Sequence, residues 1–84
     1  MDIQGPFRLN ESFVVRENDR ALFSVEKMRI FRFNRTGYAL LELLLGGALS
    51  YKDWYAKASG MMPIPENDFQ AFVEKALTNN VILV

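Results

Sequence analysis

The side chains that could carry chemistry in this sequence of 84 residues are carboxylates, lysine amines and hydroxyls, because the chain has neither histidine nor cysteine. Histidine is the commonest general acid–base residue and the commonest metal ligand. Cysteine supplies thiolate nucleophiles, disulfide bonds and metal ligands. A catalytic site in this chain would therefore need a pair of carboxylates in a pocket, or a nucleophile beside a base.

The carboxylates considered for acid–base catalysis are explained by the starts of helices. Glu66 and Asp68 stand two positions apart where a helix is predicted to begin, and the helix dipole stabilises negative charge there. Asp53 follows Ser50 by three residues, which is a variant of the capping box. The sequence has no glycine-rich phosphate-binding loop. We therefore predict that the protein is not an enzyme and that it holds no cofactor and no metal ion.

Basic side chains gather in one stretch of a chain whose ten basic and ten acidic residues balance overall. The net charge of residues 20–35 is +4, from these residues: Arg20, Glu26, Lys27, Arg29, Arg32 and Arg35. Two interpretations remain open: a solvated charged surface, or a surface that attracts an acidic peptide segment.

The predicted last helix argues against DNA binding. Residues 66–80 have a net charge of −2, whereas a DNA-reading helix carries basic side chains into the major groove. A winged-helix DNA-binding protein is therefore the weaker alternative, and we expect no nucleic-acid partner.

Three short segments near the start of the chain are typical of β-strands, since they are rich in β-branched and aromatic residues. They are Ser12–Arg16, Ala21–Val25 and Met28–Phe33. Their short connections indicate an antiparallel meander. The first ten residues, which include Gly5 and Pro6, are expected to form a loose arm, and the domain assignment places this arm at residues 1–6.

Three helices are predicted after the strands. The first covers Arg35–Leu45 after the cap Asn34 and is apolar all round, which indicates a mostly buried helix. The second covers Tyr51–Ser59 and is expected to stop at Gly60. The third begins near Pro65 or Asn67 and ends near Asn79 and Asn80, with Val81–Val84 as a short strand or a strap. The predicted fold is α+β and winged-helix-like, a three-stranded antiparallel sheet followed by three α-helices in one domain, residues 1–84.

A three-stranded meander leaves unpaired N–H and C=O groups on both of its outer strands. Arg29 and Arg32 could simply protect such an edge. Alternatively, the edge could accept a visiting strand, with Ile30 and Phe31 lining side-chain pockets. Phe69 and Phe72 of the last helix could contribute to those pockets, although their spacing also suits the core. A third possibility is that the edge pairs with a second copy in a homodimer.

The segment Leu22–Leu45 resembles PqqD-like domains. Those domains show a hairpin, an apolar residue, then Asn, a variable residue and Thr, opening an apolar helix that ends in Gly. Here that pattern reads Phe33, Asn34, Arg35, Thr36, then Leu40–Leu45 and Gly46. The resemblance covers about Phe7–Leu83. Gly37 and Asn80 depart from the pattern, which more usually has alanine and glycine at those places.

The resemblance implies a non-catalytic recognition element for ribosomally made, post-translationally modified peptides. Such domains bind the leader of a precursor peptide as a strand added to the third strand, in a groove lined by the third helix. They present the peptide to a modifying enzyme, often a radical S-adenosylmethionine enzyme. Carried over, the peptide-binding residues of the strand are Lys27, Met28, Arg29, Ile30, Phe31 and Arg32. On the third helix the apolar stripe must pack inward, so its flank should face the groove, and the residues expected there are Phe72, Lys75, Ala76 and Asn79. Arg29 and Arg32 would pair with leader carboxylates, and Phe31 and Phe72 would accept apolar anchors.

The location of the protein is expected to be the cytoplasm. Residues 1–7 lack the basic start and apolar run of a signal peptide. The longest apolar stretch, between Tyr38 and Leu49, is too short to span a bilayer. No membrane partner is expected.

Overall fold

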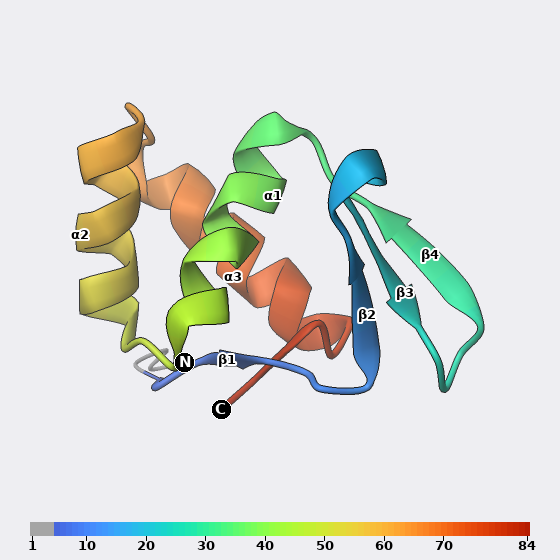
Figure 1. The fold of residues 1–84 in the computed structure, drawn as a ribbon. Coiled ribbons are helices and arrows are strands. Elements are labelled where there is room, and N and C mark those ends of the chain that lie inside the picture. Colours follow the sequence, from blue (N-terminus) through green and yellow to red (C-terminus); the bar gives the residue numbers. More distant parts are fainter. Residues whose placement is uncertain (1–4) are drawn as a thin grey trace.

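The computed structural model describes residues 5–84, apart from the side chain of Glu17, as a small sheet beside three helices (Figure 1). The sheet contains β2 (Phe13–Arg16), β3 (Ala21–Ser24) and β4 (Arg29–Arg32), and the helices are α1 (Arg35–Glu42), α2 (Tyr51–Met61) and α3 (Glu66–Thr78). Two-residue strands β1 (Arg8–Leu9) and β5 (Ile82–Leu83) form a separate antiparallel pair. The predicted α+β order, a three-stranded antiparallel sheet followed by three α-helices, is confirmed.

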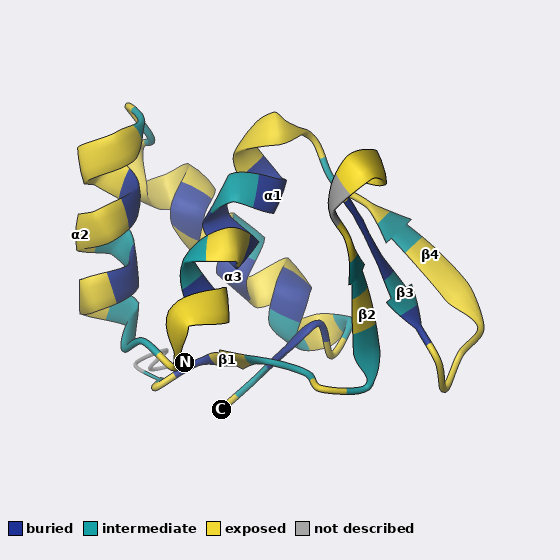
Figure 2. Ribbon diagram, in the orientation of Figure 1, coloured by how far each residue is buried: buried dark blue, intermediate teal, exposed yellow. Residues whose placement is uncertain are grey.

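The sheet is a meander in the order β2-β3-β4, with both pairs antiparallel. The central strand β3 is largely buried and β4 is largely exposed (Figure 2). The third strand was predicted to begin at Met28, and this is wrong. Met28 has a positive φ of 51° and lies in the β3–β4 turn, where the Lys27 N–H donates to the Ser24 hydroxyl. The strand can start only after this turn closes, at Arg29.

Two predicted helix caps are confirmed. The side chain of Asn34 accepts a hydrogen bond from the Gly37 N–H at 2.7 Å, and the Ser50 hydroxyl accepts one from the Asp53 N–H at 3.2 Å. These bonds satisfy backbone donors that a helix leaves unpaired in its first turn. The cap at Asn34 fixes the point, just after the end of β4, at which α1 begins.

Two predicted helix ends are wrong. α1 ends at Glu42 and continues as a 3-10 turn, Leu43–Gly46, in which Leu45 is half exposed. The second helix does not stop at Gly60 but continues to Met61. The residue before a proline disfavours helical backbone angles, and Met62, which precedes Pro63, is extended. Proline therefore ends α2, and Gly60 is an ordinary helical residue.

The core is built around aromatic rings. Trp54, Phe7 and Phe69 are fully buried, and the Trp54 ring lies 5.8 Å from that of Phe7 and 5.1 Å from that of Phe69, between centroids. The indole N–H of Trp54 donates to the carbonyl oxygen of Leu40 at 2.8 Å. This bond ties α2 to α1 inside the core.

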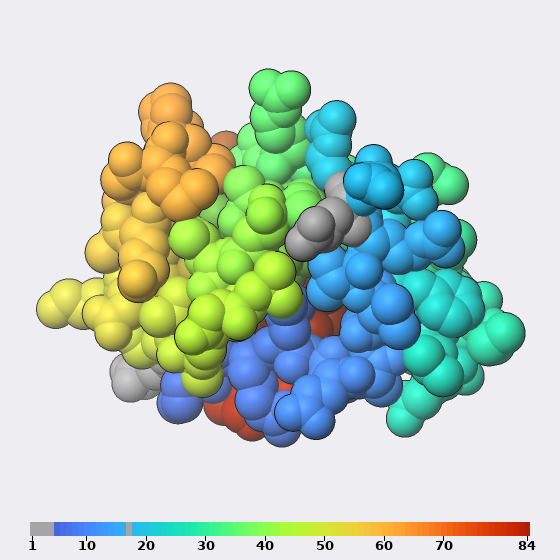
Figure 3. All heavy atoms as spheres, in the orientation of Figure 1, coloured from blue at the N-terminus to red at the C-terminus, as the bar shows by residue number. Residues whose placement is uncertain are grey.

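The expected loose arm does not extend to the buried Phe7. The Phe7 N–H donates to the Leu49 carbonyl at 2.7 Å, and β1 follows directly and pairs with β5. In the view of Figure 3 the N-terminal segment, in blue, lies in front of the C-terminal segment, in red. A large aromatic side chain that fills the core, and a terminal strand to pair with, hold this part of the arm in place. The part of the arm at residues 1–4 lies outside the described residues.

The end of α3 is closed by a Schellman motif. Asn80 adopts a left-handed conformation with φ of 57°, the Val81 N–H donates to the Ala76 carbonyl, and the Asn80 N–H donates to the Leu77 carbonyl. Asparagine tolerates this conformation better than most residues. The motif turns the chain sharply, so that the buried Val81 lies beside the last turn of α3 and leads into β5.

Candidate functional site

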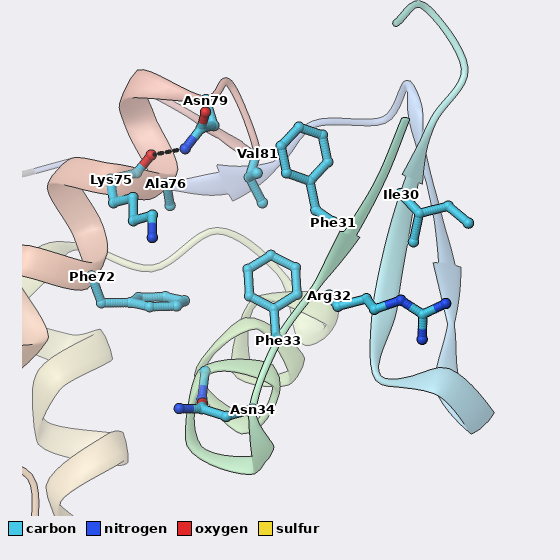
Figure 4. A pocket seen from close by; sticks show the side chains of 11 residues that line it. Ile30, Phe31, Arg32, Phe33, Asn34, Phe72, Lys75, Ala76, Asn79 and Val81 are labelled. Carbon is cyan, nitrogen blue, oxygen red and sulfur yellow. Dashed lines mark hydrogen bonds between the residues drawn. The ribbon is translucent and has the colours of Figure 1, made fainter. Parts of the chain in front are cut away.

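A cleft of about 420 Å³ lies between β4 and the C-terminal half of α3 (Figure 4). One wall comes from β4 and the residues after it, and the other wall comes from α3 and the turn that follows. The lining residues are Ile30, Phe31, Arg32, Phe33, Asn34, Gly37, Phe72, Lys75, Ala76, Asn79 and Val81.

The backbone of β4 faces this region with unpaired groups. The Phe33 N–H donates to the Arg20 carbonyl, in register with the β3–β4 pairing. Alternate residues of an antiparallel strand point their backbone N–H and C=O groups to opposite sides, so the backbone groups of Phe31, like those of Phe33, point toward β3. Ile30 and Arg32 must therefore point their backbone groups away from β3, toward the open edge. In the described part of the chain no hydrogen bond to these groups is found.

The opposite edge of the sheet differs. There the Phe13 N–H, at the start of β2, donates to the Asn10 carbonyl of the same chain at 3.1 Å. The chain thus covers part of its β2 edge with its own backbone. Unpaired edges invite strand addition, and proteins usually cover or shorten them. The β4 edge differs in that it is open at both Ile30 and Arg32 and lies beside a cleft with an aromatic wall.

The side chains on the two sides of β4 differ in character. Phe31 and Phe33 lie on the side that faces α3, and the Phe33 ring meets that of Phe72 edge-on at 6.5 Å between centroids. Ile30 and Arg32 point away from α3 (Figure 4). The inner wall of the cleft is therefore aromatic and apolar, and it stands directly beside the free backbone edge.

The charged side chains of the cleft are both basic. Lys75 extends from α3 toward the cleft, whereas Arg32 lies on the other face of β4 (Figure 4). Among the side chains that the structure describes, neither forms an ion pair. Asn79 is held by its own helix, since its side-chain N–H donates to the Lys75 carbonyl at 3.0 Å. A peptide lying along β4 would meet positive charge on both of its faces.

Most of the predicted peptide-binding residues meet at this cleft. They are Ile30, Phe31, Arg32, Phe72, Lys75, Ala76 and Asn79. The other three do not line it. Lys27 and Met28 belong to the exposed β3–β4 turn, and the Arg29 guanidinium lies 5.4 Å from the centre of the Phe31 ring.

Sequence reasoning missed four lining residues: Phe33, Asn34, Gly37 and Val81. Phe33 could have been found, because it is two positions after Phe31 and therefore shares its side of the strand. Gly37 and Val81 depend on the approach of α1 to α3 and on the turn at Asn80, and sequence spacing gives no signal for these. Phe69, considered for the pocket, is instead fully buried in the core.

Two further features were sought among the described residues, a metal-binding group and a membrane-spanning helix. Residues 5–84 contain no group of three or more His, Cys, Asp or Glu side chains placed to bind a metal ion. In the same part of the chain no helix combines the length and the apolar character needed to cross a bilayer. The cleft offers outward backbone hydrogen-bonding groups, an aromatic and apolar wall, and two cationic side chains.

No family model matches the chain, and no curated protein and no solved structure shows significant similarity to it.

Proposed function

We propose that this protein is a non-catalytic peptide-binding domain that takes a segment of a precursor peptide as an added strand on β4. The observation that carries the proposal is the free edge of β4, where the backbone groups of Ile30 and Arg32 point outward beside an apolar cleft. Strand addition uses such an edge for affinity and the neighbouring pockets for selectivity.

The arrangement favours a particular pattern in the bound segment. Successive side chains of a strand alternate between two faces. Guest side chains on the inner face would contact Phe31, Phe33 and Phe72, so apolar residues are favoured at alternate positions. The positions between them would lie beside Ile30 and Arg32. Lys75 on one face and Arg32 on the other favour carboxylates in the guest.

The wider role follows from the PqqD-like pattern of Phe33 to Gly46. On that reading the guest is the leader of a ribosomally made precursor, and the domain presents it to a modifying enzyme of the radical S-adenosylmethionine type or of another type. The chemistry belongs to that enzyme. Such a complex would form in the cytoplasm, where the precursor is made.

The test uses the direction of one N–H group. In Ile30→Pro the strand loses an outward donor but no β3–β4 ladder bond, and proline is tolerated in edge strands at such positions. Ile30→Ala is the matched control, because it removes the side chain and keeps the N–H. Peptides are first enriched on the wild-type protein from a random-sequence display library, and their affinities for all three proteins are then measured by fluorescence anisotropy.

We expect peptides with alternating apolar residues and at least one carboxylate to be enriched. Ile30→Pro should weaken their binding by about tenfold or more, the loss of a hydrogen bond that cannot be replaced, and Ile30→Ala should have a smaller effect. The proposal fails if no peptide binds more tightly than about 100 μM, near 5–6 kcal/mol. It also fails if Ile30→Pro binds as wild type does.

The open edge equally permits pairing with a second copy of the chain. Sedimentation velocity separates the two possibilities. A dimer that Ile30→Pro dissociates, and that no peptide disrupts, would assign the edge to self-association and overturn the proposal. A protein that stays monomeric when the peptide binds would support it.

A further inference from the structure

A second cleft, of about 510 Å³, lies between the start of α1 and the connection from α2 to α3. Its apolar lining includes Leu40, Met62, Pro63 and Ile64. Asp68, in the first turn of α3, is its charged lining residue. Nothing in the role assigned to β4 uses this cleft.

The second cleft adjoins the first. Asn34, Gly37 and Phe72 line both of them. At Gly37 a side chain would narrow the junction, because a Cβ atom there would lie 3.3 Å from Cε1 of Phe72 and 3.2 Å from Oδ1 of Asn34. A side chain at Gly37 would therefore crowd the place where the two clefts meet.

The walls of the second cleft are held in place before any guest arrives. The Tyr55 hydroxyl donates to the Ile64 carbonyl at 2.9 Å, and the rings of Pro63 and Pro65 fix two backbone φ angles in the connection. A preformed surface loses little conformational entropy when it binds a ligand. A cleft that is apolar, preformed and open suits a side chain from a passing peptide.

The two clefts differ in charge. The first is lined by the cations Arg32 and Lys75, and the second is lined by the carboxylate of Asp68. A single guest chain that followed both would be complementary if its charge changed sign along its length.

We propose that the two clefts form one peptide groove. The guest strand leaves β4 at the Arg32 end, passes Gly37 and places an apolar side chain and a basic side chain in the second cleft. The apolar side chain packs against Met62 and Ile64, and the basic side chain pairs with Asp68. This inference rests on the proposed function and adds a ligand class to it: a peptide with an acidic strand-forming segment followed, on the α1 side, by an apolar and basic segment.

The test compares two lengths of an enriched peptide on the ¹⁵N-labelled protein. The short form is the minimal segment that binds, and the long form continues by several residues, including an apolar and a basic residue, at the end nearest Arg32. We expect both forms to shift the amide signals of Ile30 and Arg32. Only the long form should shift those of Ile64 and Asp68, and it should bind about tenfold more tightly, as expected for one more buried apolar side chain.

A charge reversal supplies the second measurement. Asp68→Lys should remove most of the gain from the longer peptide and leave the affinity of the short peptide unchanged. Glu66→Lys is the matched control, since Glu66 is exposed in the same helical turn and lines neither cleft. This control should retain the gain.

The outcomes separate the two proposals. If the long peptide shifts Ile30 and Arg32 but neither gains affinity nor shifts Ile64 and Asp68, the groove ends at β4, and the further inference is overturned while the proposed function stands. An equal loss in Asp68→Lys and Glu66→Lys would also overturn it, because the effect would then be general electrostatics. If no peptide of either length shifts the β4 signals, the proposed function itself fails.

Discussion

Gly37 faces the ring of Phe72 so closely that an added Cβ atom would lie 3.3 Å from Cε1 of that ring. A glycine inside a helix costs up to about 1 kcal/mol relative to alanine. Gly37 has no positive φ that would require glycine. Its place at the junction of the two clefts offers a functional reason for a residue without a side chain, where the PqqD-like pattern more usually has alanine.

Gly37→Ala should therefore affect binding more than folding. The gain in helix propensity and the crowding against Phe72 and Asn34 oppose each other, so we expect the free energy of unfolding to change by less than about 1 kcal/mol. The affinity for long peptides should fall more than the affinity for short ones, as anisotropy titrations can measure. Unchanged affinity for both lengths would contradict the view that this junction carries the guest.

Tyr51→Phe should flatten the loss of stability in alkali. Burial first, and then the negative charges of Glu66 and Glu74, raise the pKa of Tyr51 above its ordinary value. The folded state then holds the phenol proton more tightly than the unfolded state does. The contribution of the protonated Tyr51 side chain to folding stability is therefore complete below about pH 10, the pKa of a tyrosine in the unfolded chain. It is lost as the pH rises from there through the raised pKa of the folded state. Melting temperatures between about pH 9 and 11 should fall more steeply for wild type than for the variant, and parallel curves would contradict this.

Trp54→Phe should destabilise the fold without abolishing it. The phenyl ring can occupy most of the buried space, but the hydrogen bond from the indole N–H to the Leu40 carbonyl is lost. We expect a loss of about 1–3 kcal/mol in urea unfolding, because a buried carbonyl loses a partner and some volume is left empty. Tyr55→Phe is the comparison, since its bond to Ile64 is only partly buried and should be worth less. An equal loss of unfolding free energy in Trp54→Phe and Tyr55→Phe would contradict the expectation that the buried hydrogen bond is worth more.

The parts of the fold that local chemistry determines could be predicted from the sequence. Asn34 and Ser50 cap helices because their side chains accept bonds from first-turn amides, whatever the rest of the chain does. The predicted helix stop at Gly60 was wrong because a helix can continue through glycine at a moderate cost, whereas Pro63 forbids the angles at Met62. Gly60 and Pro63 are competing signals for the end of α2, and the steric restriction imposed by the proline determines where the helix ends.

The candidate site depends on longer-range packing and was predicted less completely. Strand alternation and helix spacing bring Phe31 and Phe72 to the cleft, and both could be named in advance. Arg29 could not be excluded from sequence spacing. It shares the inner side of β4 with Phe31, yet its guanidinium lies against that ring and outside the cleft. Phe7 was assigned to a loose arm, because no local pattern shows that a distant core has space for its ring.

Charge reversal at Lys75 should weaken peptide binding more than charge reversal at cations that do not line the cleft. We expect Lys75→Glu to weaken the binding of acidic peptides by about tenfold at low salt, with a smaller effect at high salt, where charges are screened. Arg29→Glu should change affinity less, because Arg29 does not line the cleft. Lys57→Glu, at an exposed position of α2 outside the cleft, is the control for net charge. If all three variants lose affinity equally, the attraction comes from overall charge, and the position of Lys75 in the cleft has no special role.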